Sequence, residues 1–283
     1  MEYTIAHTTT YVYPEPISES YAVVHLKPRS DPNQFCTRYE LEVAPRATVF
    51  SYADRFGNDA QHFAVLPTHD RLSITARSNV ATTPPEAAPR VDEATRALLD
   101  ADGDPDAWYA FLRESQYVRF TAPLDEFLKE LGPPGERIGT WCSSVAAHVH
   151  RTFSYDKAAT TVRSAVDDAL ATRAGVCQDF AHVMIAAARN AKIPARYVSG
   201  YIFRGDSHVL GAEASHAWCE AYLPPSGWIG FDPTNDRLVD DHYVKIAIGR
   251  DYRDVSPVRG VYRGSADAEM SVDVAMEALA NQQ

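Results

Sequence analysis

Three stretches in the second half of the chain decide the fold: TRAGVCQDFAHVMIAAARNAKIP at residues 172–194, ASHAWCEAYLP at 214–224 and GWIGFDPTN at 227–235. The first becomes strongly apolar and rich in alanine after Cys177, and it ends at Pro194. This pattern predicts a buried helix that begins at the cysteine and ends before the proline. Gly175, two residues before Cys177, suggests a turn that leads into the helix.

The second and third stretches predict neighbouring strands. Apolar and polar residues alternate in the second, so His216, Trp218 and Glu220 share one face of a strand. The third is short and ends at Asp232, because the proline that follows opposes a longer strand. The PPSG sequence at 224–227 forms a turn between the two strands. If they pair antiparallel, Asp232 lies beside His216.

This combination of residue types is typical of a thiol nucleophile. A cysteine on the first turn of a helix lies at the positive end of the helix dipole, which favours the thiolate. A nearby imidazole can act as the base, and a carboxylate can orient the imidazole. Each of the three alone also fits a structural role, as a buried cysteine, a strand histidine or a turn aspartate. Together, Cys177, His216 and Asp232 predict a catalytic triad.

Two segments resemble the bacterial transglutaminase-like proteins, whose core is related to that of papain-like cysteine proteases. They are GVCQDFAHVMIAAARNAKIPARYVSGY and SHAWCEAYLPPSGWIGFDPTN. The resemblance covers about residues 140–264, and residues 1–83 resemble the N-terminal domain of many bacterial members. It implies that Cys177 is the nucleophile, His216 the base and Asp232 the orienting acid. Family members include transglutaminases, peptidases, amidases and proteins of unknown activity.

Further site residues are suggested more weakly. Papain-like proteases carry an oxyanion glutamine before the nucleophile, whereas DDALATRAGV, at 167–176, contains none. The backbone N–H of Cys177 is one expected oxyanion donor, and Tyr155 and Gln178 are candidates for a second. Tyr155 could instead serve only in packing, and Gln178 could be a surface residue at the helix start.

The loop GRDYRDVSPVRG, at 249–260, is dense in charged and aromatic residues. Arg250, Asp251 and Tyr252 are therefore candidates for lining a substrate cleft, as is Trp218 on the face of the His216 strand. The alternative for the loop is a salt-bridged brace. No group of His, Cys, Asp and Glu has the spacing of metal ligands, so we expect neither a metal nor another cofactor.

The sequence predicts an α+β protein. Residues 1–83 alternate as short strands and predict a β-rich, sandwich-like N-terminal domain. Residues 84–91 form a proline-rich linker, and 92–270 form a papain-like transglutaminase core of helices packed on an antiparallel sheet. Within this core, helices are expected at 93–101, 107–115, 121–131 and 136–153. Residues 271–283 form a C-terminal strand and tail.

Composition limits the partners. The chain has 283 residues and a formal net charge of −11, which argues against nucleic acid. It has no apolar stretch long enough to cross a membrane, and its N-terminus does not have the pattern of a signal peptide. The four cysteines are widely spaced, so we expect no disulfide framework and a cytoplasmic location.

The expected function is acyl transfer through a Cys177 thioester, with a peptide or protein amide as the substrate. Hydrolysis is favoured because transfer to an amine requires a cleft that excludes water. The alternatives are a transglutaminase and a non-catalytic peptide-binding or scaffold protein of the same fold. The resemblance also suggests a link to an ATP-grasp-type ligase system, as in some bacterial members.

Overall fold

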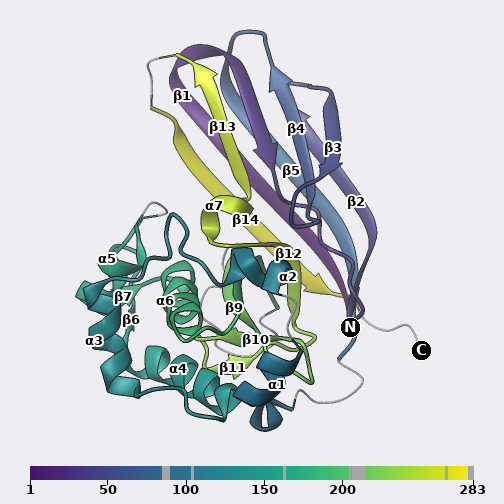
Figure 1. The fold of residues 1–283 in the computed structure, drawn as a ribbon. Coiled ribbons are helices and arrows are strands. Elements are labelled where there is room, and N and C mark those ends of the chain that lie inside the picture. Colours follow the sequence, from purple (N-terminus) through teal and green to yellow (C-terminus); the bar gives the residue numbers. More distant parts are fainter. Residues whose placement is uncertain are drawn as a thin grey trace.

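The computed structural model describes residues 1–84, 90–102, 105–161, 164–203, 205, 215–264 and 267–279. The fold has a β-rich unit and a second unit in which helices cover a sheet (Figure 1). The α+β class predicted from the sequence is confirmed. Most of the expected linker, residues 85–89, and the last four residues of the expected tail lie outside the described residues.

The β-rich unit combines both ends of the chain. Its strands are β1 (Glu2–Val24), β2 (Gln34–Ala44), β3 (Val49–Ala53), β4 (Asp59–Val65), β5 (His69–Thr82), β13 (Val258–Arg263) and β14 (Glu269–Ala278). β1 is long enough to join two ladders. Its first half pairs with β5 and β14, and its second half pairs with β4 and β13. Apolar side chains of both ladders form one core, including Ile17, Val24, Phe63 and Ile74.

This pairing moves one boundary of the expected domains. From the sequence, residues up to 270 are expected in the transglutaminase-like core. In the structure, β13 pairs antiparallel with β1, so residues 258–263 lie in the β-rich unit. β14 also pairs with β1, over Tyr3–Val12. Partners separated by more than 200 residues cannot be recognised from the local pattern of either strand.

The core contains helices α1 (Arg96–Ala101), α2 (Pro105–Trp108), α3 (Ala122–Leu131), α4 (Ile138–Thr152), α5 (Val166–Thr172), α6 (Cys177–Asn190) and α7 (Tyr252–Val255). Two 3-10 turns, Val91–Glu93 and Tyr109–Phe111, lie on either side of α1 and α2. The helix expected at 107–115 is therefore mostly absent. Trp108 packs on Tyr222 and Phe111 packs on Trp228, and these tertiary contacts outweigh local helix propensity.

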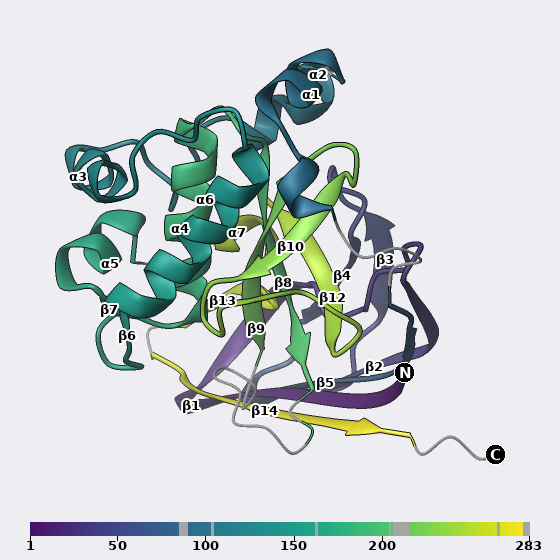
Figure 2. The same ribbon diagram turned by 90° about the horizontal axis from the view of Figure 1, so that it is seen from below.

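The remaining strands are β6 (Ser154–Tyr155), β7 (Ala174–Gly175), β8 (Ala195–Ile202), β9 (His216–Tyr222), β10 (Trp228–Asp232), β11 (Arg237–Leu238) and β12 (Tyr243–Gly249). Five of them form an antiparallel sheet in the order β11-β10-β9-β8-β12. Small residues of β9, namely Ala217, Cys219 and Ala221, pack in the same core as α6. Turned by 90°, the sheet lies between the helices and the β-rich unit (Figure 2).

β12 lies at one edge of this sheet, and side chains of the β-rich unit cover its open edge. The Gln34 amide donates to the Lys245 carbonyl and accepts from the Lys245 N–H, both at 2.7 Å. The Asn58 amide makes the same pair of bonds with Ile248, both at 2.8 Å. Buried backbone groups need such partners. The two units are thus joined by hydrogen bonds at the edge of the sheet that holds His216.

No helix of the described residues is long and apolar enough to cross a membrane.

Candidate active site

Cys177 is the first residue of α6, the most completely buried helix of the core. Its side chain is 8% exposed. Asp179 organises this first turn: its Oδ2 accepts from the Val176 N–H at 2.8 Å and from the Thr160 hydroxyl at 2.6 Å. Burial raises the pKa of Asp179, against the effect of these bonds. The helix start that the sequence predicted for Cys177 is therefore present and capped by a side chain of its own turn.

Gly175 is required by this cap. A Cβ at residue 175 would lie 2.5 Å from Asp179 Oδ2 and 2.8 Å from Asp179 Cβ. No other residue type fits without displacing the carboxylate. The sequence suggests a flexible turn at this glycine. In the structure, its role is to let the backbone at residue 175 approach the Asp179 side chain closely.

His216 and Asp232 lie on the neighbouring antiparallel strands β9 and β10. His216 begins β9, Asp232 ends β10, and His216 Nε2 lies 2.8 Å from Asp232 Oδ2. Both side chains are fully buried. The other ring nitrogen, Nδ1, has no hydrogen-bond partner among the described residues. The Cys177 thiol lies close enough to the His216 ring to raise its pKa. The structure thus brings the three predicted residues together.

The electrostatics favour a protonated ring. Burial alone would lower the pKa of His216, but the charge and hydrogen bond of Asp232, with a contribution from Cys177, outweigh burial and raise it. Conversely, burial would raise the pKa of Asp232, but His216 and the other donors lower it. The pair is therefore most stable as imidazolium and carboxylate.

Asp232 accepts further hydrogen bonds from residues that are not among the predicted site residues. Its Oδ2 also accepts from the Tyr243 hydroxyl at 2.8 Å and from Asn235 Nδ2 at 2.7 Å. Its Oδ1 accepts from the backbone N–H of Thr234 at 2.9 Å. The Thr234 carbonyl is in turn bound by His150 of α4 at 3.0 Å. The sequence DPTN at 232–235 indicates part of this arrangement, because an aspartate side chain often accepts from the backbone N–H two residues later.

The oxyanion candidates lie at the same end of α6. Tyr155 pairs with Gly175 in the short parallel ladder of β6 and β7, and its ring packs edge-on against Phe180. This pairing places the Tyr155 backbone beside the residue two positions before Cys177. Gln178 is 7% exposed, so it is a buried residue rather than one on the helix surface.

Trp218 lines a cavity of about 520 Å³ to which Cys177 does not contribute. It is fully buried on the opposite face of β9 from the small residues that contact α6, and it packs with Val198, Ile202 and Tyr243. Its ring lies edge-on to that of Tyr243, with centroids 5.3 Å apart. Trp218 thus supports the residue that binds Asp232.

The three loop candidates serve largely as a brace, which was the alternative for this loop. Arg250 is ion-paired with Asp254 through Nε at 2.8 Å. Asp251 is buried, and it accepts from the backbone N–H groups of Tyr117 and Arg253. The Tyr252 N–H donates to His182 Nε2 at 3.2 Å. Among these three, Arg250 also lines a cavity.

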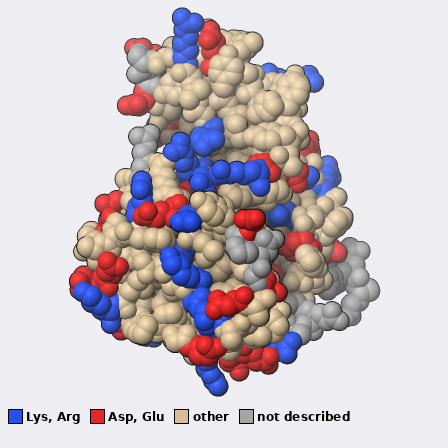
Figure 3. Space-filling model, viewed as in Figure 1, with Lys and Arg blue, Asp and Glu red and all other residues tan. Residues whose placement is uncertain are grey.

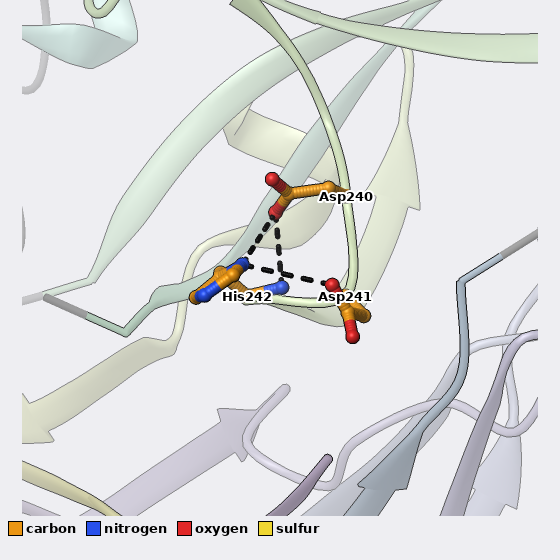
Figure 4. A group of neighbouring side chains, drawn as sticks. All are labelled: Asp240, Asp241 and His242. Atoms are coloured by element: carbon orange, nitrogen blue, oxygen red, sulfur yellow. Dashed lines mark hydrogen bonds and ion pairs between the residues drawn. The ribbon is translucent and has the colours of Figure 1, made fainter. Parts of the chain in front are cut away.

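One group of possible metal ligands occurs among the described residues. Asp240, Asp241 and His242 offer ligand atoms within 4.8 Å of one another (Figure 4). His242 Nδ1 lies 3.2 Å from Asp240 Oδ1 and 3.6 Å from Asp241 Oδ1. Asp240 is exposed, Asp241 and His242 are partly buried, and all three lie in the loop before β12. Since exposed acidic groups commonly occur without a metal, this geometry alone assigns none.

A helix-start cysteine beside a strand histidine and a strand-end aspartate defines the class of the fold. The chain belongs to the transglutaminase-like superfamily, whose family model matches residues 136–233. The bacterial transglutaminase-like N-terminal region matches residues 3–81. The chain is also similar to uncharacterized protein Rv2569c of Mycobacterium tuberculosis, with 33% identity over 96% of this chain and 92% of that protein.

Two further likenesses concern proteins with a described activity. A solved structure described as "a Putative Cysteine Protease from Cytophaga hutchinsonii" has a TM-score of 0.80 and 26% identity, over 99% of this chain and 92% of that one. The protein-glutamine gamma-glutamyltransferase of Pseudomonas aeruginosa is 38% identical over 92 residues. That match covers 30% of this chain and 14% of that protein.

Proposed function

We propose that the protein is a thiol-dependent acyl-transfer enzyme that hydrolyses amide or peptide bonds. The observation that carries this proposal is the position of His216, whose Nε2 binds Asp232 while the Cys177 thiol lies near the ring. Such a ring can exchange a proton with the nucleophile while the carboxylate keeps its orientation. The Cytophaga structure, described as "a Putative Cysteine Protease", supports the same chemistry.

The proposed reaction has two halves. The Cys177 thiolate attacks the carbonyl carbon, and the imidazolium of His216 gives its proton to the leaving amine as the C–N bond breaks. This leaves an acyl group on the sulfur as a thioester. A water molecule then loses a proton to His216 and attacks the thioester, and release of the acid restores the thiolate and imidazolium. Backbone N–H groups at the start of α6, with Tyr155 or Gln178, are proposed to bind the oxyanion.

Transfer to an amine is the second candidate. The likeness of a core segment to a protein-glutamine gamma-glutamyltransferase favours it. In that reaction an amine, rather than water, attacks the thioester. Hydrolysis is preferred because transfer demands a cleft that excludes water.

We also propose a cytoplasmic location, supported by the absence of a disulfide among the four cysteines.

One experiment separates these functions. The protein is incubated with a library of peptide amides, with and without a primary amine, and the products are weighed by mass spectrometry. Hydrolysis gives acids under both conditions, whereas transfer gives amine adducts when the amine is present. The Cys177→Ala variant is the control. If the wild-type protein produces neither acids nor adducts from any library member, the proposal fails and a binding or scaffold role is favoured.

A further inference from the structure

A cavity lined by residues of both units lies away from the candidate triad. It has a volume of about 590 Å³ and is lined by Arg55, Phe56, Tyr109, Ala110, Arg113, Glu114 and Arg250. Three separate segments contribute: the loop between β3 and β4, the chain around the 3-10 turn after α2, and the residue that follows β12. The cavity therefore lies where the β-rich unit meets the core.

The lining is positively charged, although the chain as a whole carries a net charge of −11. The lining contains three arginines and one carboxylate, that of Glu114, and one oxygen of that carboxylate already accepts from the Phe120 N–H at 2.7 Å. Asp254, outside the lining, pairs with two of the arginines, so one positive charge remains in excess. On the face of the molecule drawn in Figure 3, Lys and Arg side chains gather across the middle, where the two units meet. An anion would gain from this local excess of positive charge.

Two of the guanidinium groups lie on aromatic rings. Arg113 is centred 4.8 Å from the Tyr109 ring, and Arg55 lies 4.6 Å from the Phe56 ring. Arg55 shares the carboxylate of Asp254 with Arg250. Among the described residues, no carboxylate forms an ion pair with Arg113. Its charge is therefore held in place by stacking and is not neutralised by a neighbour.

The floor of the cavity is fixed to α6. Arg189, near the end of that helix, is fully buried and donates to the backbone carbonyls of Arg113 at 3.0 Å and Arg250 at 2.6 Å. Two of the three cavity arginines are thus anchored through their backbones. Cys177 begins the same helix, and Arg189 lies about 18 Å from it along the helix axis, at 1.5 Å per residue.

We propose that this cavity binds a small organic anion, in which a carboxylate or phosphoryl group is carried on a flat apolar body. Guanidinium groups match both kinds of anion through paired hydrogen bonds. The volume is within the range of ligand sites and exceeds what a bare phosphate fills. The Tyr109 ring, which is 60% exposed, provides a face for the flat body. The site is separate from the triad and does not depend on the proposed acyl-transfer reaction.

Isothermal titration calorimetry at low salt tests the proposal with four probes: phenyl phosphate, benzoate, inorganic phosphate and benzyl alcohol. Phenyl phosphate or benzoate should bind to one site and more tightly than the other two probes. A preference between phenyl phosphate and benzoate identifies the phosphoryl group or the carboxylate as the natural anion. Binding should be the same in Cys177→Ala, which separates this site from the proposed reaction.

Arg113→Gln and Arg55→Gln should each weaken binding about tenfold, as expected for loss of a charge-assisted hydrogen bond. Arg119→Gln, which changes an exposed arginine outside the lining, is the matched control and should bind as the wild type does. Thermal unfolding establishes that each variant is folded. No saturable binding of either ring-bearing anion, or unchanged binding in both cavity variants, overturns the proposal. Equally tight binding of inorganic phosphate overturns the requirement for a flat body.

Discussion

The Tyr243 hydroxyl and the His216 ring bind the same oxygen of Asp232, each at 2.8 Å. Tyr243 belongs to β12 and His216 to β9, and β8 lies between these two strands in the sheet. The carboxylate, at the end of β10, is therefore held by the neighbouring strand and by the edge strand beyond β8, in addition to the turn that follows it. Its orientation depends on the packing of the whole sheet.

Replacing Tyr243 should reduce turnover without abolishing it. Tyr243→Phe removes one donor from Asp232 but keeps the ring that packs against Trp218. We expect kcat to fall about tenfold and KM to change little, because this residue positions the acid and does not contact the substrate. Tyr222→Phe is the matched control, since it removes a hydroxyl bound to exposed Asp102. Equal effects of the two substitutions would contradict a positioning role for Tyr243.

The members of the triad should contribute unequally. Cys177→Ala should abolish turnover, and His216→Ala should cost nearly as much. Asp232→Asn should lower kcat/KM about 10²-fold, because the ring loses charge stabilisation but keeps a hydrogen-bond partner. The double variant Cys177→Ala with Asp232→Asn should be no worse than Cys177→Ala. Steady-state kinetics on a substrate found in the library screen measures these effects. Full activity in folded Cys177→Ala would refute the thioester reaction.

Cys177 should react with iodoacetamide faster than the other cysteines. Cys142 and Cys219 are almost completely buried, and burial raises the pKa of each thiol. Burial also raises the pKa of Cys36, which is half-buried. Peptide mapping by mass spectrometry at short times gives the order. Faster labelling of Cys36 than of Cys177 would mean that exposure, not the neighbouring imidazolium, controls reactivity.

Gly175→Ala should disturb the start of α6. The added Cβ would displace the Asp179 carboxylate from the Val176 N–H. We expect a loss of about 1–3 kcal/mol in the free energy of unfolding and slower alkylation of Cys177. The double variant Gly175→Ala with Asp179→Ala tests the cause, because it removes the clash. It should recover part of the stability, and a further loss would locate the strain elsewhere.

Acid should destabilise the protein through Glu220. Burial opposes the charge of this carboxylate, but Arg196 and Lys245 outweigh burial and lower its pKa from 4.5 to about 2. Because the folded pKa lies below the unfolded one, the stabilisation is complete above about pH 4.5 and is lost as the pH falls toward 2. We expect a contribution of about 2–4 kcal/mol.

Urea unfolding between pH 6 and pH 3 measures this loss. Glu220→Gln should be less stable than the wild type at pH 6, and its stability should change less as the pH falls. Glu277→Gln, at an exposed position in β14, is the control and should follow the wild type. A wild-type pH dependence in Glu220→Gln would assign the acid sensitivity to other carboxylates, of which Asp232 is the first candidate.

The sequence predicted those features that depend on local patterns. The apolar run after Cys177 predicts a buried helix, and the alternation around His216 predicts a strand with its small residues on one face. Tyr243 was not predicted because its contact with Asp232 depends on strand order. A salt-bridged brace at 249–260 follows from the charges of that loop, but its partner does not, since Tyr117, whose N–H Asp251 binds, is 134 residues away in the chain. Contacts of this kind follow from tertiary packing, which the spacing of one segment does not contain.

The two amide side chains that close the edge of β12 mean that the β-rich unit is not a removable accessory. A chain shortened to begin at Arg90 would lack Gln34 and Asn58, so the backbone groups of Lys245 and Ile248 would face solvent. An uncovered strand edge recruits other strands, and self-association through β12 would compete with folding. The same exposure would loosen the strand that carries Tyr243. We therefore expect the two units to fold as one entity, and a fragment cut at the boundary between the two family regions to self-associate.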